Sequence, residues 1–407
     1  MMRPAHAAAL GLLLAISGCG SKDRAPYAVG AAYDGKSSGG AGAGDGLIHT
    51  VPPPPPPPDA GGLCGNQIIP LILDHPNLYF VLDASGSMND AMDRPNARGI
   101  LLSKYAAARG AIAEVLRTVG HRVSYGAAIF PGDPDASGDL SCPPGAEVFP
   151  TQPGDPVAWA ISGNDGPVLT SLLNTLARRA PSGLTPTAAS IEALKGTLLG
   201  LKGKTYAFLL TDGAPNCDLS RGCTVDGCTI NIEARAAGFP GCTDDPTLNC
   251  CDPKYGAYDY RWCLDGDPTV AAVSELASGG VQTYVIGMPG TAAYQGLLDR
   301  LAIAGGTARP TEPQYYPVDG SDDLATTLQQ IGLSVTISCD VKLEQVPPDP
   351  SSVRVYFDQT MIHLDPQNGW TWASDDTIRM VGSSCDQLKA GDVVQVQVVA
   401  NCPAQTM

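Results

Sequence analysis

The stretch Asn77-Leu78-Tyr79-Phe80-Val81-Leu82-Asp83-Ala84-Ser85-Gly86-Ser87 decides the fold of this chain. Its first six residues form a nearly continuous apolar run, which predicts a strand buried on both faces of a parallel sheet. The string Asp-Ala-Ser-Gly-Ser then places carboxylate and hydroxyl groups directly where the strand ends. Ligand sites of open α/β sheets lie at the carboxyl ends of their strands, so this segment is a candidate functional site.

Short apolar runs alternate with helical patterns on both sides of this stretch. We expect further strands at residues 122–130, 205–210, 281–287 and 315–318, and an irregular loop at 130–149. Helices are expected at 99–119, 168–179, 187–199, 269–278, 291–303 and 322–331. The alternation predicts an α/β fold with a doubly wound, mostly parallel sheet. From about residue 336 the pattern changes to period two, which predicts a small antiparallel β module at 336–407.

Two later segments complete a pattern with Asp83, Ser85 and Ser87. Thr185 lies in a loop just before an expected helix, and Asp212 follows the expected strand at 205–210. The order DASGS, LTPT and LLTDG resembles the von Willebrand factor A domain with its metal-ion-dependent adhesion site, and we assign residues 67–335 to such a domain. The resemblance implies that these five side chains are metal ligands. The alternative is a chance array of turn and helix-cap residues.

The implied ligands suit a hard divalent cation. All are oxygens and only two are carboxylates, which favours Mg²⁺ or Mn²⁺, with Ca²⁺ less suited to five small donors. Such an ion would keep an open or water-filled position. An Asp or Glu carboxylate of a protein partner could fill that position, which would give metal-dependent adhesion rather than catalysis.

The N-terminus predicts export and a lipid anchor. Arg3 precedes an apolar run at 7–17, and the segment Ile16-Ser17-Gly18-Cys19 resembles a bacterial lipobox, which implies removal of residues 1–18 and lipidation of Cys19. An ordinary secretory signal is the alternative. The residue after Cys19 is not Asp, which favours the outer membrane with either leaflet open. Residues 19–66, with prolines from Pro52 to Pro58, predict a flexible tether, and no later segment predicts a membrane-spanning helix.

The 13 cysteines of the chain indicate an oxidising compartment. Lipidation of Cys19 would leave these disulfide candidates: Cys64, Cys142, Cys217, Cys223, Cys228, Cys242, Cys250, Cys251, Cys263, Cys339, Cys385 and Cys402. An odd number of them lies in a Cys-rich insert at about 214–265, so we expect Cys142 to pair with the insert. Domain termini are often close, so we expect Cys64 to pair with Cys339, and then Cys385 with Cys402. Zinc ligation in the insert is the alternative.

The composition and the absence of catalytic motifs in the sequence argue against several classes of function. A net charge of −16, from 25 basic and 41 acidic residues, argues against nucleic-acid binding. The sequence has no HExxH, Walker A or G-x-S-x-G motif, so we expect no enzyme. Trp370 and Trp372 could stack a sugar, but a place in the core of the β module is favoured. We therefore expect a cell-envelope lipoprotein that mediates metal-dependent protein binding or adhesion. The alternatives are a scaffold component with a purely structural metal, and a hydrolase or carbohydrate-active protein.

Overall fold

The computed structural model describes residues 67–69, 71–72, 75–133, 142–217, 222–233, 247–255, 258–336, 338–390, 393 and 396–402. All of them fall in the unit Pro55–Met407. The expected signal, lipidation site and tether, with Cys64 and Cys242, lie outside the described residues. No helix in the described ranges combines the length and the hydrophobicity needed to cross a membrane.

A six-stranded sheet forms the centre of the α/β part, in the order β5-β4-β3-β6-β7-β8. The strands are β3 (Asn77–Asp83), β4 (Ser124–Phe130), β5 (Ala146–Pro153), β6 (Thr205–Thr211), β7 (Val281–Gly287) and β8 (Tyr316–Pro317). All neighbours pair in parallel except β5, which runs antiparallel to β4. This topology confirms the prediction of a mostly parallel, doubly wound sheet. The quoted apolar run is β3, all of whose residues are buried near the middle of the sheet.

Strand β5 was not predicted, because residues 130–149 were interpreted as an irregular loop. The strand contains Pro150 and Pro153, and its residues are mostly exposed. Proline cannot donate a ladder hydrogen bond, so it occurs in strands mainly at sheet edges. Here β5 is an edge strand, and its register with β4 shifts around Ala127. Because of these prolines and exposed residues, β5 lacks the alternating apolar pattern by which a strand is predicted from sequence.

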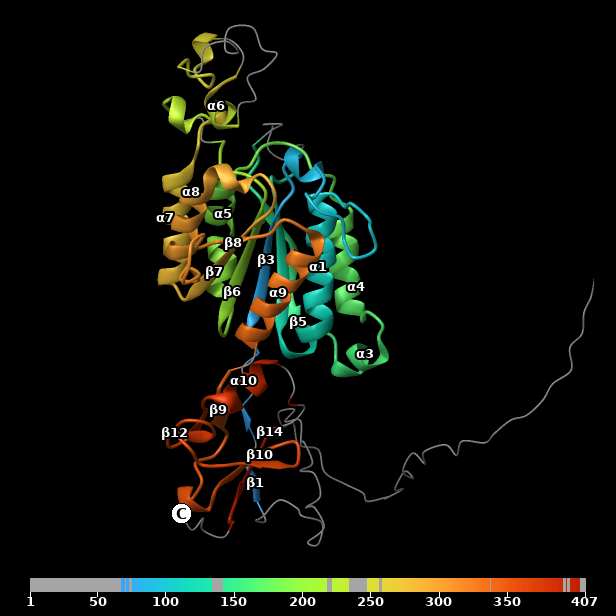
Figure 1. Cartoon of the computed structure of the whole chain (residues 1–407), viewed down its shortest axis with the longest axis vertical. Coiled ribbons are helices and arrows are strands. Elements are labelled where there is room, and N and C mark those ends of the chain that lie inside the picture. Colours follow the sequence, from blue (N-terminus) through green and yellow to red (C-terminus); the bar gives the residue numbers. More distant parts are fainter. Residues whose placement is uncertain are drawn as a thin grey trace, which may run out of the picture. The chain divides into compact units, whose positions relative to one another are not determined.

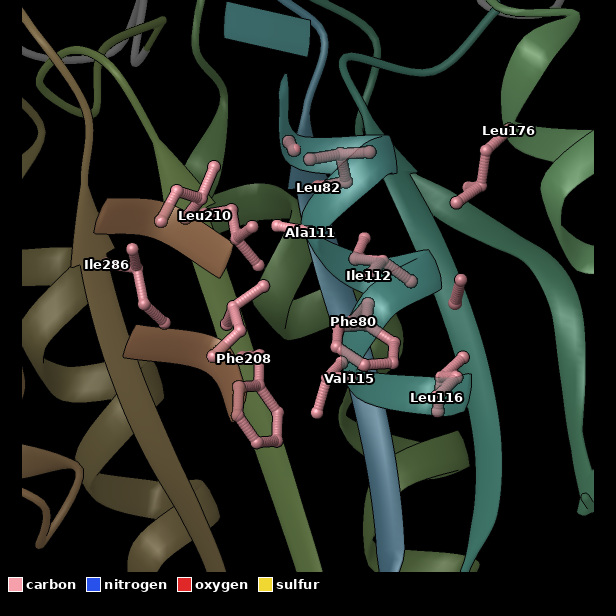
Figure 2. Close-up of a cluster of buried hydrophobic side chains, with 14 of the residues drawn as sticks. Phe80, Leu82, Ala111, Ile112, Val115, Leu116, Leu176, Phe208, Leu210 and Ile286 are labelled. Atoms are coloured by element: carbon pink, nitrogen blue, oxygen red, sulfur yellow. The ribbon is translucent and has the colours of Figure 1, made fainter. Parts of the chain in front are cut away.

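Helices cover both faces of the sheet (Figure 1). One face carries α1 (Lys104–Val119), α4 (Pro167–Ala177) and α9 (Ser321–Thr336), and the other carries α5 (Thr187–Gly200), α7 (Gly266–Ser278) and α8 (Gln295–Ala304). Successive residues of β3 point to opposite faces, so Phe80 and Leu82 join the first cluster, while Tyr79 and Val81 join the second. Figure 2 shows Phe80, Leu82 and Phe208 packed against residues of α1. The two cores hold the strand ends that carry the candidate site.

The Cys-rich insert between β6 and α7 has a small core of its own. It contains η3 (Val225–Gly227), α6 (Thr229–Ile232), η4 (Pro253–Tyr255) and η5 (Tyr260–Trp262). Disulfides join Cys223 to Cys263 and Cys228 to Cys251, and Cys250 is also disulfide-bonded. A candidate group for a metal, formed by Cys223, Cys251 and Cys263, is thus made of disulfide sulfurs. This agrees with disulfides rather than zinc ligation in the insert.

The C-terminal part forms two four-stranded sheets, in which all strands pair antiparallel as predicted. One contains β1 (Gln67–Ile69), β14 (Val396–Ala400), β10 (Arg354–Phe357) and β11 (Thr360–Ile362). The other contains β12 (Trp370–Ser374), β13 (Thr377–Met380), β9 (Asp340–Leu343) and β2 (Leu71–Ile72). A helix, α10 (Ser383–Ala390), precedes β14.

Strands β1 and β2 place residues 67–72 with the C-terminal strands, although the sequence analysis grouped these residues with the large sheet. β1 pairs with β14 and β2 pairs with β9. Runs of three and two residues carry too little periodic pattern to identify their sheet partner. The large sheet therefore begins with β3, and the β module is assembled from both ends of the described chain.

Two expectations about the β module have different outcomes. Cys339 pairs with Cys385, so the expected bridges Cys64–Cys339 and Cys385–Cys402 are wrong. Counting cysteines left the connectivity open, because an even number of cysteines does not tell which sulfurs meet in space.

Trp370 is only 2% exposed, and its ring packs edge-on against Trp372 with centroids 5.7 Å apart. The indole N–H of Trp370 also donates to a backbone carbonyl, so the expected core role is confirmed for Trp370, while Trp372 is half-buried against the same core.

Candidate metal site

The turn after β3 buries a carboxylate among polar partners. Asp83 is the last residue of β3 and is fully buried, and Ser85 is 2% exposed. The backbone N–H of Ser85 donates to Asp83 Oδ1 at 2.8 Å, which closes a short turn of the type that Asp favours. The 3-10 helix η1 (Gly86–Asn89) follows, and it presents Ser87 beside Ser85. Their hydroxyl oxygens are 3.3 Å apart.

The end of β6 lies beside this turn because β3 and β6 pair in parallel. The Thr211 hydroxyl donates to Asp83 Oδ2 at 2.6 Å, and the Ser87 hydroxyl donates to Asp212 Oδ1 at 2.9 Å. Asp212 is 3% exposed. Gly290, with φ +113°, passes so close that a Cβ there would lie 2.5 Å from the Asp212 carbonyl oxygen. The predicted residues Asp83, Ser85, Ser87 and Asp212 therefore form one hydrogen-bonded cluster.

The loop that contains Thr185 is held against both neighbouring loops. The N–H of Gly86 donates to Gly183 O at 3.0 Å. On the other side, the Thr185 N–H donates to Asn216 Oδ1 at 2.8 Å, and the Asn216 N–H donates to Thr185 O at 2.9 Å. Thr185 is 7% exposed and Asn216 is 6% exposed. The structure thus brings all five predicted residues to one edge of the sheet, where Asp83 ends β3, Ser87 lies in η1 and the other three lie in loops.

Asn216 and Lys104 also belong to this site, although no sequence motif indicated either residue. Lys104 is the first residue of α1, and its Nζ donates to Asp212 Oδ2 at 2.8 Å. The side chains of this ion pair are 8% and 0% exposed. Neither residue lies in the recognised motif segments. No local signal could have found them, because each acts through a contact with a residue distant in the sequence.

The carboxyl groups of Asp83 and Asp212 are both buried in this site, and burial disfavours their ionised forms. Burial, followed by the negative charge of Asp212, raises the pKa of Asp83 to about 7. Burial also raises the pKa of Asp212, although the charge and the hydrogen bond of Lys104 act in the opposite direction. The exposed Asp90 carboxylate adds to the rise at Asp212. Paired carboxylates in a low-dielectric site favour a bound cation.

The donor geometry fits a small divalent cation. Neighbouring ligands of an octahedral Mg²⁺, each about 2.1 Å from the ion, lie about 3 Å apart. The separations of 3.3 Å between the hydroxyls of Ser85 and Ser87, and 2.9 Å between Ser87 Oγ and Asp212 Oδ1, are close to that value. The donors are carboxylates and hydroxyls, which bind Mg²⁺ and Mn²⁺ in preference to softer ions. These residues therefore fit Mg²⁺ or Mn²⁺.

The disulfide Cys142–Cys217 lies directly beside this site. Cys142 follows β4, and Cys217 follows Asn216. The expected pairing of Cys142 with the cysteines after Asp212 is confirmed. The bond joins the segment that carries Asn216 to a second segment of the α/β part. It therefore anchors the contact between Asn216 and Thr185.

No protein-family model matches the sequence, and no curated protein matches it. Similar solved structures include a D319A mutant of the PilB minor pilin from Streptococcus sanguinis, with a TM-score of 0.42 and 16% identity over 65% of this chain. The pilus adhesin SpaC from Lactobacillus rhamnosus GG has a TM-score of 0.42 and 15% identity over 83% of this chain.

A third similar structure is the vWF domain of the type V pili tip protein Mfa5 from Porphyromonas gingivalis. Its TM-score is 0.39, with 13% identity over 65% of this chain and 96% of that one. The matches cover 62% of the PilB chain and 40% of the SpaC chain. The strand order and the placement of the helices on both faces of the sheet establish the fold of this chain independently of these similarities.

Proposed function

We propose that this chain is a lipid-anchored protein of the cell envelope whose α/β domain, of the von Willebrand factor A type, binds Mg²⁺ or Mn²⁺ and adheres to a protein partner through that ion. One observation carries the proposal: hydroxyl and carboxylate oxygens of Ser85, Ser87 and Asp212 gather at octahedral spacing at the carboxyl edge of the sheet. Lipidation of Cys19 and location at the outer membrane remain part of the proposal, and they rest on the sequence motif alone.

Each residue of the site would have a separate role in binding the metal. Ser85, Ser87, Thr185 and Asp212 would hold the ion, and Asp83 would join them directly or through water. Thr211 and the Ser85 N–H orient the Asp83 carboxylate, because each donates to one of its oxygens. Asn216 holds the Thr185 loop in place. The bound ion supplies a Lewis-acidic position that accepts a carboxylate oxygen of the partner. We propose binding without turnover.

A second candidate function has a specific observation in its favour. The loops are already joined by Asn216, by the backbone bond between Gly86 and Gly183, and by the ion pair between Lys104 and Asp212. A metal in such a pre-organised site could serve stability alone, in a scaffold component of an envelope assembly. This alternative predicts binding to partners that survives removal of the metal.

Calorimetry of Mg²⁺ binding tests the proposal. The Cys19→Ser chain avoids lipidation and is compared with the same chain carrying Asp83→Ala and Asp212→Ala. Asp375→Ala, which removes an exposed carboxylate of the β module, is the matched control. We expect saturable binding to the parent and the control but not to the double variant. We also expect acidic peptides to bind only with Mg²⁺. No saturable binding to the parent would refute the proposal, and peptide binding that persists in EDTA would favour the scaffold function.

A further inference from the structure

A buried lysine is paired with one of the candidate metal ligands. Lys104 begins α1, where its N–H donates to Asp90 O at 2.9 Å and the preceding Ser103 hydroxyl accepts from Ala106 N at 3.3 Å. These contacts fix the first turn of the helix and direct the lysine side chain toward the site. Its ammonium lies 2.8 Å from Asp212 Oδ2, with 8% of the side chain exposed. Among the ion pairs of the described residues, no other includes a candidate metal ligand.

Burial of a lysine side chain costs free energy unless a strongly interacting partner compensates for the lost hydration. A buried ammonium loses its hydration, and a single carboxylate repays that loss only in good geometry. Here the partner is itself buried, and its second oxygen accepts from Ser87. The pair is therefore insulated from the screening that weakens surface ion pairs. Its charge acts at nearly full strength on any ion held by Asp212.

Lys104 changes the net charge of the candidate metal site. With both carboxylates ionised, Asp83 and Asp212 contribute two negative charges, Lys104 contributes one positive charge, and the serine and threonine hydroxyls contribute none. The site without metal is then a monoanion, and a divalent cation turns it into a monocation. One carboxylate from a partner restores neutrality. Asp90 lies nearby but is exposed, so water screens its charge.

We infer that Lys104 sets the charge of this site so that the divalent ion binds weakly by itself and tightly together with one monoanionic carboxylate. The inference rests on the proposed function and deepens it, since it states which ligand charge the site selects. Without the lysine, the two carboxylates would neutralise the ion, and an incoming carboxylate would add an uncompensated negative charge. With the lysine, metal and carboxylate each strengthen the binding of the other by the same factor.

The test removes the charge and keeps the shape. Lys104→Met retains an unbranched apolar stem without the ammonium, and Lys104→Gln serves as a second variant. Lys195→Met is the matched control, because Lys195 is paired with Glu192 and Glu275 on the surface, away from the cluster. All variants are made in the full Cys19→Ser chain. Mg²⁺ affinity is measured by calorimetry, with and without acetate as the carboxylate probe, and unfolding by urea is followed in EDTA.

We expect Lys104→Met to bind Mg²⁺ about tenfold more tightly than the parent, because a buried like charge is removed. We expect acetate to strengthen Mg²⁺ binding at least about fivefold in the parent and in Lys195→Met, and less than about twofold in Lys104→Met. If both Lys104 variants unfold in EDTA, the rise in melting temperature with Mg²⁺ replaces calorimetry. That rise is then expected to exceed the rise in the parent.

The outcomes separate this inference from the proposed function. If the parent binds Mg²⁺ and Lys104→Met binds it equally or more weakly, the inference is wrong and the proposed function stands. An unchanged acetate effect in Lys104→Met would also overturn the inference. If the parent does not bind Mg²⁺ even with acetate but Lys104→Met does, the lysine prevents metal binding, and both the inference and the proposed function fail. Absence of binding to every variant overturns both.

Discussion

Replacement of Asn216 by alanine tests how the metal-site loops are held. The Asn216 side chain accepts the Thr185 N–H at 2.8 Å, and its own backbone N–H donates to Thr185 O at 2.9 Å. Alanine keeps the backbone bond and removes the acceptor, which leaves the N–H of a residue that is 7% exposed without this partner. An unsatisfied buried donor costs about 1–3 kcal/mol. We therefore expect the free energy of unfolding to fall by about that amount.

The same variant should weaken Mg²⁺ binding, because Thr185 is no longer held in position. Residues that orient metal ligands typically change the affinity by about 10–100-fold, and we expect a loss in that range. Urea unfolding in EDTA measures the stability, and calorimetry of the Cys19→Ser chain measures the affinity. The slope of the unfolding free energy with urea should not change, since the exposed surface stays the same.

Two controls accompany this variant. Asn174→Ala removes an exposed amide on α4 and should change the stability by less than about 0.5 kcal/mol. Asn216→Asp keeps an oxygen that can accept the Thr185 N–H, so most of the lost stability should return. If Asn216→Ala unfolds with the free energy of the parent and binds Mg²⁺ with the affinity of the parent, the contact with Thr185 does not position the site.

Three further changes probe the surrounding structure. Replacing Cys142 and Cys217 together by serine opens a loop of 75 residues, so urea unfolding should show a loss of about 2–4 kcal/mol. Arg117 lowers the pKa of Asp165 through hydrogen bonds, so Asp165→Asn should lower the stability at pH 7 by a measurable amount, which the exposure of the pair limits to about 1 kcal/mol. That difference should vanish as the pH falls through the lowered pKa of Asp165, and equal stabilities at pH 7 would contradict it. Phe208→Ala should cost about 3–5 kcal/mol in unfolding experiments, because Phe208 is 1% exposed.

Periodicity predicted the central strands of the large sheet well, but it missed the exposed edge strand β5 and the short strands β1 and β2. The expected strand at 281–287 coincides with β7, and the expected strand at 205–210 differs from β6 by one residue. Strand β6 is buried except for half-buried Tyr206, and β7 is buried from Val285 to Gly287, so both strands are mostly apolar. Strand β5 is exposed and contains prolines, and β1 and β2 are very short. Such strands owe their conformation to pairing with a neighbour, which the local pattern does not record.

The sequence by itself determined the α/β class, the positions of the buried strands along the chain and the polar residues at the ends of β3 and β6. Apolar runs dictate burial, and parallel strands bring their carboxyl ends to one edge. Only the tertiary structure decided that Lys104 pairs with Asp212, that Asn216 holds Thr185, and that Cys339 joins Cys385. Each of these contacts joins residues at least 31 positions apart. Contacts of this kind depend on how whole elements pack, and the periodicity of a short segment contains no information about them.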